Sequence, residues 1–133
     1  VRDGLLGRLA ERPDLDLVVP SDALALTRDL GKRLAGTVIV LDEKRDMARL
    51  VIHGWTIDVA RQDGASLELD LQRRDYSINA MALPLRPEGG LMDPTGGLED
   101  LKRRRLVAVR ESNLTDDPLR LFRRQVQAPV FQL

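Results

Sequence analysis

Three strand-like runs follow one another in the middle of the chain, with no helical pattern between them. They cover residues 37–41, 47–52 and 55–60. Only His53-Gly54 separates the last two runs, and a two-residue turn of this composition joins antiparallel strands. The runs therefore predict an antiparallel meander, and such a sheet has to bury one face under other elements.

An earlier strand-like run, at residues 15–19, carries carboxylates at its start. Because residues i and i+2 of a strand point to the same face, Asp14 and Asp16 should project together while Leu15 and Leu17 face a core. Two adjacent anions repel unless a cation lies between them. Mg²⁺ is commonly held by one or two carboxylates together with substrate phosphates. The pair favours metal-dependent phosphoryl or nucleotidyl transfer, although Asp-x-Asp also describes a solvated strand edge.

Helical patterns and further strands surround these runs. Helices are predicted at 2–10, 66–74 and 98–105. A further helix is predicted from its N-cap, Ser21, to residue 35, and a final helix has Pro118 in its first turn. Short strands are predicted at 78–85, 91–92 and 106–109. The mixed order predicts an α+β (mixed α/β) domain whose largely antiparallel sheet is flanked by helices.

Composition narrows the classes of partner. The net formal charge is zero, so global charge does not predict nucleic-acid binding, but residues 101–124 hold eight Lys or Arg against three acids. That segment suits either phosphate contact or a solvated helix face. The absence of cysteine excludes a disulfide partner and Cys-based zinc sites. No stretch has the pattern of a signal peptide or a membrane span, so we expect a cytoplasmic protein without a membrane partner.

Several short motifs occur in a fixed order. They are Val1-Arg2-Asp3-Gly4, Asp14-Leu15-Asp16, Ile57-Asp58-Val59, Arg73-Arg74-Asp75, Asp93-Pro94-Thr95-Gly96-Gly97 and Asp116-Asp117-Pro118-Leu119-Arg120. The series resembles the bacterial class II tRNA nucleotidyltransferases (CCA-adding enzymes) and poly(A) polymerases. The resemblance implies a polymerase-β-like nucleotidyltransferase head, the catalytic palm, at residues 1–110, followed at 111–133 by a truncated start of the helical neck.

The resemblance also implies an activity. Asp14 and Asp16 would be the catalytic carboxylates that hold Mg²⁺, and Asp58 would be either a third carboxylate or a surface residue at a strand end. The enzyme would add C and/or A nucleotides, taken from CTP and/or ATP, to the 3′ end of tRNA or another RNA and release pyrophosphate. Only 16 residues separate Asp58 from Asp75, and this short connection resembles that of CC-adding enzymes and of some minimal poly(A)-polymerase-like relatives.

Nucleotide contacts are implied for six further residues. Arg2 would contact the triphosphate, and Arg74 with Asp75 would recognise the ribose, although cations at a helix C-terminus give the same pattern. Asp117 and Arg120 lie three residues apart on one predicted helix face and would read the base, with a plain ion pair as the alternative. Arg123 matches a further arginine of the family.

An alternative function stays open from the sequence. The two glycines that precede Arg2 in the family, and the domains that hold RNA, lie outside this sequence. In this alternative, the chain is a non-catalytic relic or fragment of such a head domain, and it acts as an RNA- or partner-binding module.

Overall fold

The computed structural model describes residues 1–86 and 88–115. The chain divides into two compact units. We call Arg8–Leu67 the sheet unit, and Val1–Gly7 together with Glu68–Leu133 the helical unit. Each unit is described by itself.

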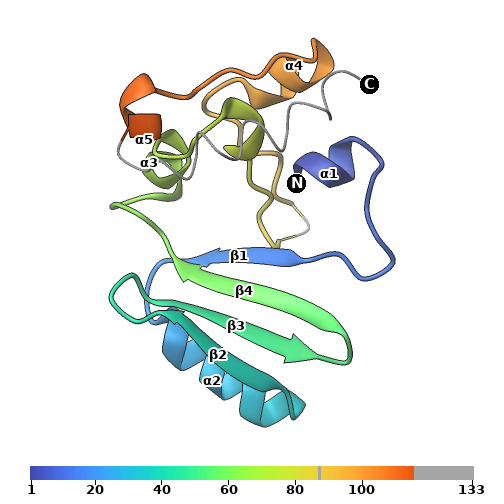
Figure 1. The fold of residues 1–133 in the computed structure, drawn as a ribbon, viewed down its shortest axis with the longest axis vertical. Helices are drawn as coiled ribbons and strands as arrows, with labels where there is room; N and C mark the ends of the chain where they lie inside the picture. Colours follow the sequence, from blue (N-terminus) through green and yellow to red (C-terminus); the bar gives the residue numbers. More distant parts are fainter. Residues whose placement is uncertain (87, 116–133) are drawn as a thin grey trace. The chain divides into compact units, whose positions relative to one another are not determined.

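The sheet unit contains a four-stranded sheet in the order β1-β4-β3-β2 (Figure 1). Its strands are β1 (Leu15–Val19), β2 (Thr37–Asp42), β3 (Met47–Ile52) and β4 (Trp55–Arg61). The β2–β3 and β3–β4 pairs are antiparallel, whereas β1 pairs with β4 in parallel. The predicted meander and the α+β fold with a largely antiparallel sheet are therefore confirmed.

Helix α2 (Ala23–Leu34) covers one face of this sheet. Ala48, Leu50 and Val59 are completely buried in the sheet unit. Gly31 allows the close approach of helix and sheet, because a Cβ at this position would lie 2.5 Å from Cγ2 of Val38. The core of the sheet unit is thus a thin layer of small and aliphatic side chains.

The start of α2 differs from the prediction. Ser21 is not the N-cap; its hydroxyl donates to the Asp22 carboxylate at 3.2 Å, and Asp22 adopts a left-handed conformation before the helix. The first amides of the helix instead donate to the carboxylate of Asp46, at 2.9 Å from Ala23 N and 2.8 Å from Leu24 N. The hydrogen bonds from the amides of Leu24 and Ala23 lower the pKa of Asp46.

The helical unit contains short helices around its own core. They are α1 (Arg2–Leu5), α3 (Leu67–Gln72, whose first residue falls in the sheet unit), the 3₁₀ helix η1 (Ser77–Asn79), α4 (Gly97–Lys102) and α5 (Glu111–Thr115). Tyr76, Ile78, Met81 and Leu101 form the buried cluster. The helix expected at 2–10 is much shorter because Gly7 has a positive φ of 67° just beyond α1.

Regular strands are not formed by the described residues at 78–85, 91–92 and 106–109, where the sequence predicts them; each run takes part only in a single bridge. That part of the chain contains η1 and two isolated bridges, Tyr76–Ala108 and Ala82–Met92. Ile78 and Met81 are buried there, whereas Leu83 and Leu85 are exposed. A short buried apolar run does not reveal by its periodicity whether it is extended or helical.

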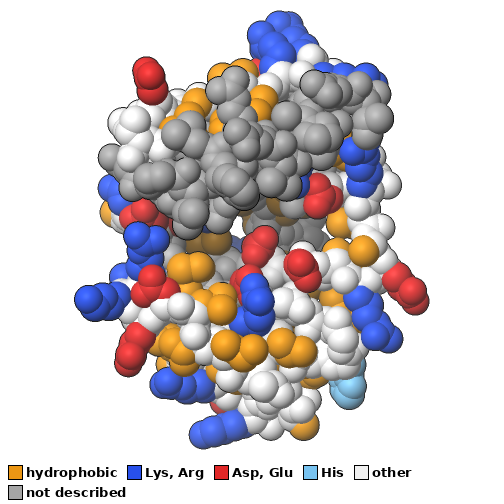
Figure 2. All heavy atoms as spheres, in the orientation of Figure 1, with side chains coloured by type: hydrophobic (Ala, Val, Ile, Leu, Met, Phe, Trp, Pro, Cys, Tyr) orange, Lys and Arg blue, Asp and Glu red, His pale blue; other side chains and the backbone are white. Residues whose placement is uncertain are grey.

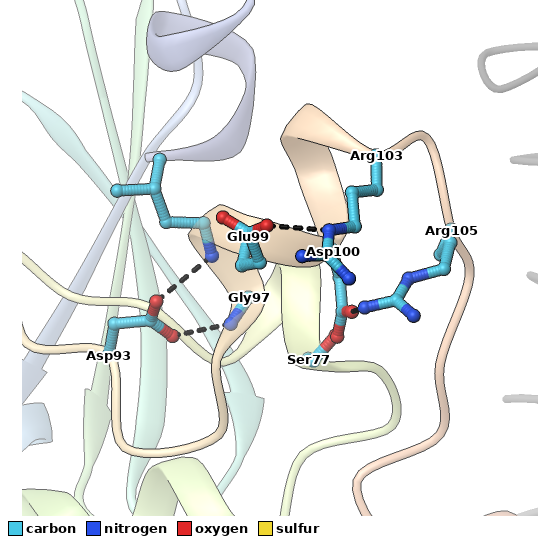
Figure 3. A network of polar contacts seen from close by, with 8 residues as sticks. Ser77, Asp93, Gly97, Glu99, Asp100, Arg103 and Arg105 are labelled. Atoms are coloured by element: carbon cyan, nitrogen blue, oxygen red, sulfur yellow. Dashed lines mark hydrogen bonds and ion pairs between the residues drawn. The ribbon is translucent and has the colours of Figure 1, made fainter.

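Helix α4 is held against η1 by a buried polar network (Figure 3). The Asp93 carboxylate accepts hydrogen bonds from Gly97 N at 2.6 Å and from Leu98 N at 2.9 Å. The Ser77 hydroxyl donates to the buried Asp100 at 2.7 Å. A Cβ on Gly97 would overlap the Ser77 carbonyl, so only glycine permits this close contact.

Two properties of the described residues bear on possible partners: the mixture of charges on the surface and the length of the apolar helices. Figure 2 shows Lys and Arg side chains interspersed with Asp and Glu side chains, in keeping with the zero net formal charge. Among the residues that the structure describes, no helix is long and apolar enough to cross a bilayer.

Candidate active site

Three charged residues lie side by side across neighbouring strands of the sheet unit. Asp16 of β1 is the register partner of Asp58 in β4, and Asp58 is the partner of Arg49 in β3. Register partners point to the same face of a sheet. Because Val59 and Leu50, the next residues along β4 and β3, are buried in the core, the charged row occupies the opposite face.

Asp14 extends this row at the start of β1. It lies one residue before the strand and two before Asp16, and both carboxylates are exposed. Within residues 1–86 and 88–115, neither carboxylate forms a hydrogen bond or an ion pair. Leu15 is more exposed than predicted, at 39%, and Leu17 is half-buried. The carboxylates of Asp14 and Asp16 are thus both presented to solvent, as the alternation of the sequence predicts.

Asp58 is held by an arginine that the sequence analysis did not single out. Arg49 donates through Nε to Oδ1 at 2.7 Å and through Nη2 to Oδ2 at 3.0 Å. The hydrogen bond to Asp58 raises the pKa of Arg49, the charge of Asp58 adds to this, and the charges of Asp14 and Asp16 raise it further. The guanidinium is thus a counter-ion for the whole row. We call Asp14, Asp16, Asp58 and Arg49 the charged row.

A signal for Arg49 was present in the sequence. The His53-Gly54 turn has both φ values positive, 48° and 80°, as in the two-residue turns that match strand twist. Such a turn places Ile52 opposite Trp55. Three residues further from the turn along each strand, Arg49 lies opposite Asp58.

The donor set suits a hard cation only in part. Among the described residues there is no group of three or more His, Cys, Asp or Glu that could hold a metal ion. Asp14 and Asp16 nevertheless fit Mg²⁺, because this ion needs only one or two carboxylates when phosphates and water complete its shell. Asp58 is engaged by Arg49, so its role as a third carboxylate stays a prediction.

Two of the residues predicted to bind nucleotide are connected within the helical unit. Arg2 donates through Nη1 to the side-chain oxygen of Asn79 at 2.9 Å, and the Asn79 amide donates to Oδ1 of Asp75 at 3.2 Å. The same oxygen accepts the Tyr76 amide at 2.7 Å, and Asp75 is only 5% exposed. Asn79 therefore links a guanidinium suited to phosphate with a carboxylate suited to a hydroxyl.

Arg74 lies just beyond the end of α3. It donates to Oδ1 of the buried Asp70 through Nη2 at 2.6 Å and Nε at 2.9 Å. Its side chain remains 40% exposed. This geometry agrees both with ribose recognition and with the simpler explanation of a cation near a helix C-terminus.

The residues predicted to read the base, Asp117 and Arg120, lie outside the described residues, as does Arg123. Asp14, Asp16 and Asp58 belong to the sheet unit, whereas Arg2, Arg74 and Asp75 belong to the helical unit.

Comparison with known proteins gives a consistent result. Residues 1–107 match the family described as the poly A polymerase head domain. The CC-adding tRNA nucleotidyltransferase of Synechocystis sp. is 46% identical over 132 residues, which cover 99% of this chain and 32% of the relative. The A-adding tRNA nucleotidyltransferase of Deinococcus radiodurans is 42% identical over 123 residues, covering 92% and 27%. The chain thus spans less than a third of the length of these curated relatives.

Solved structures agree with the sequence comparisons. A Thermotoga maritima CCA-adding enzyme in complex with tRNA matches with a TM-score of 0.78 and 35% identity, over 92% of this chain and 30% of that one. A tRNA-processing enzyme with CTP matches with a TM-score of 0.78 and 36% identity, over 92% and 34%. With the family match covering most of its length, the chain belongs to the poly A polymerase head domain family, as the head domain of the class II tRNA nucleotidyltransferases.

Proposed function

We propose that this chain is the catalytic head of a Mg²⁺-dependent tRNA nucleotidyltransferase. It transfers C and/or A nucleotides from CTP or ATP to the 3′ end of tRNA and releases pyrophosphate. The observation that carries this proposal is the exposed carboxylate pair Asp14 and Asp16 at the start of β1, which has no partner among the described residues, in a chain whose relatives are tRNA nucleotidyltransferases.

The side chains available suit this chemistry. Asp14 and Asp16 would hold Mg²⁺, which supplies charge stabilisation at the triphosphate and activates the attacking hydroxyl. The RNA 3′-hydroxyl attacks the α-phosphorus and pyrophosphate leaves in line, so the protein need not provide a nucleophile. Its other residues bind and orient: Arg2 the phosphates, Arg74 and Asp75 the ribose.

Base selection is assigned to residues beyond α5. The carboxylate of Asp117 accepts and the guanidinium of Arg120 donates hydrogen bonds, so together they can pair with the Watson–Crick edge of cytosine or adenine. Arg123 supports them from the next turn. One observation favours cytidine: the short connection of 16 residues between Asp58 and Asp75.

The test uses the chain and a chimera, because the relatives are about three times longer. In the chimera this chain replaces the matching segment of the Synechocystis CC-adding enzyme. Both proteins are incubated with labelled CTP or ATP and a tRNA that lacks its CCA end. We expect the chimera to incorporate label, with CTP preferred. Changing Asp14→Asn and Asp16→Asn should reduce incorporation to about one-thousandth, because the metal-holding groups are lost.

A control separates chemistry from folding. Asp29→Asn removes an exposed carboxylate whose partner, Arg33, lies on the same helix, and it should leave incorporation unchanged. Circular dichroism and tRNA binding establish that each chimera is folded. A folded chimera that binds tRNA and incorporates neither nucleotide contradicts the proposal.

One observation favours the non-catalytic alternative. Arg49 engages both oxygens of Asp58, and the described residues contain no group of three or more His, Cys, Asp or Glu that could hold a metal ion. A head domain that binds RNA or a protein without chemistry would need no such group. Metal-independent RNA binding by the chain, without any Mg²⁺-dependent binding of CTP or ATP, would favour this alternative.

A further inference from the structure

The charged row contains an ion pair, between Arg49 and Asp58, beside two exposed carboxylates. Asp14 and Asp16 are exposed and unpaired within the described residues, whereas Asp58 is 25% exposed and both of its oxygens are engaged. A guanidinium that donates in parallel to both oxygens of a carboxylate occupies about two of its four lone-pair positions and places a positive charge beside it, which opposes the approach of a cation. The three carboxylates are therefore not equivalent toward a metal.

We propose that Arg49 withholds Asp58 from the metal site and thereby keeps the affinity of the charged row for a bare divalent cation low. Asp14 and Asp16 bind the cation, and Asp58 joins them only when the guanidinium is displaced. Arg49 is a positioning residue in this account, since it acts on the metal through Asp58. The inference rests on the proposed function, because it takes Asp14 and Asp16 as ligands of the cation.

The backbone determines this competition. Arg49 and Asp58 are register partners in a hairpin with a two-residue turn, so the β3–β4 ladder keeps the two side chains adjacent on one face of the sheet. Asp16 lies on the other side of Asp58, in β1. The Asp58 carboxylate consequently has a cationic neighbour on one strand and an anionic neighbour on the other, and a bound metal would have to compete with the first.

The experiment measures Mn²⁺ binding to the 133-residue chain by the electron paramagnetic resonance signal of free Mn²⁺. Arg49→Met removes the guanidinium and should raise Mn²⁺ affinity about tenfold, since one more carboxylate enters a weak site. Arg49→Lys keeps the charge but not the two parallel hydrogen bonds, and it should raise the affinity by a smaller factor.

A second background separates release of Asp58 from simple loss of charge. In Asp58→Asn, the further change Arg49→Met should alter Mn²⁺ affinity by less than about threefold, because no carboxylate remains to be released. An equal gain in both backgrounds would mean that Arg49 acts only through its charge and would overturn the inference. Arg45→Met is the matched control; Arg45 forms an exposed, longer pair with Asp42 at 3.8 Å.

The remaining outcomes distinguish this inference from the proposed function. If the parent binds Mn²⁺ and Asp14→Asn with Asp16→Asn removes that binding, but Arg49→Met and Arg49→Lys change nothing, the inference fails and the proposed function stands. If neither the parent nor the folded Arg49 variants bind Mn²⁺ at millimolar concentration, the inference also fails. Should Arg49→Met not fold, Arg49→Lys alone decides, by a gain or by no gain.

Discussion

At the scale of single residues, side chains that connect other side chains have the clearest geometry. Asn79 accepts from Arg2 and donates to Asp75. It therefore fixes the positions of two groups that are predicted to meet the nucleotide. Preorganisation of this kind lowers the cost of ordering side chains when a ligand binds.

Asn79→Ala provides a prediction at this scale. Without the amide, Arg2 and Asp75 lose a shared partner, so a nucleotide must order both of them on binding. Loss of such hydrogen bonds costs about 1 kcal/mol, and we expect the KM for CTP of the chimera to rise about fivefold to tenfold with a smaller change in kcat. Steady-state kinetics at varied CTP measure this.

The control for Asn79→Ala is a change at a neighbouring residue that also forms a side-chain hydrogen bond. Ser77 lies in the same 3₁₀ helix and donates a buried hydrogen bond to Asp100 at 2.7 Å, which Ser77→Ala removes. It should lower thermal stability and leave KM unchanged. Equal effects of the two variants on KM would show that Asn79 acts only through the fold.

The predictability of the site differs from residue to residue. The projection of Asp14 and Asp16 follows from alternation along one strand, and it could be read from the sequence. Arg49 could have been found too, from the hairpin register. The link from Arg2 through Asn79 to Asp75 could not, because it joins residues 77 positions apart, and no local pattern encodes such a contact.

At the scale of elements, the tight turns were the reliable signals. The turn at His53-Gly54 fixed the β3–β4 pairing, whereas the apolar run around Ile78 lacked both alternation and flanking turns of defined type. The start of α2 was mispredicted for another reason. Its capping carboxylate, Asp46, comes from a turn more than twenty residues later in the chain.

Asp46→Asn tests this cap and its pH dependence. The pKa of Asp46 is lowered in the folded chain by the amides of Leu24 and Ala23. Its stabilisation is therefore complete above the unfolded pKa of about 3.9 and is lost as pH falls through the lower folded pKa. Asn keeps the left-handed backbone acceptable but removes the charge.

We expect Asp46→Asn to lower the free energy of unfolding by about 1 kcal/mol at pH 7. Urea unfolding at several pH values should show this difference shrinking as the pH drops below about 4. Glu43→Gln removes the same charge from the same turn, where Glu43 is exposed, and should have little effect. A difference that grows at acid pH would contradict the cap.

At the scale of the whole molecule, the chain has two centres of stability. The sheet unit is organised around Leu50 and Val59, and the helical unit around Tyr76 and Ile78. Regions with separate buried clusters tend to open as separate cooperative units. The sequence did not predict this division, because the predicted head at 1–110 runs through both units, and only the structure shows residues 1–7 grouped with the chain after residue 67.

Gly97→Ala tests whether the units open separately. The added methyl would overlap the Ser77 carbonyl, so α4 must move away from η1. Such overpacking against backbone costs about 2 kcal/mol or more. Native-state hydrogen exchange should show faster exchange in η1 and α4, at amides such as Ala80 and Arg103, whose carbonyl partners are Ser77 and Glu99, and unchanged exchange across the β3–β4 ladder.

Gly90→Ala is the matched control in the same unit, because a Cβ there would meet no atom within 4 Å. It should leave exchange unchanged throughout. If Gly97→Ala accelerates exchange in β3 and β4 as strongly as in α4, the chain opens as one cooperative structure. A selective effect would instead mean that the carboxylates of the sheet unit that are predicted to bind metal keep their positions, while the residues of the helical unit that are predicted to bind nucleotide lose theirs. Mn²⁺ binding would then survive Gly97→Ala, whereas CTP binding would weaken, and measuring both on one preparation decides between the two outcomes.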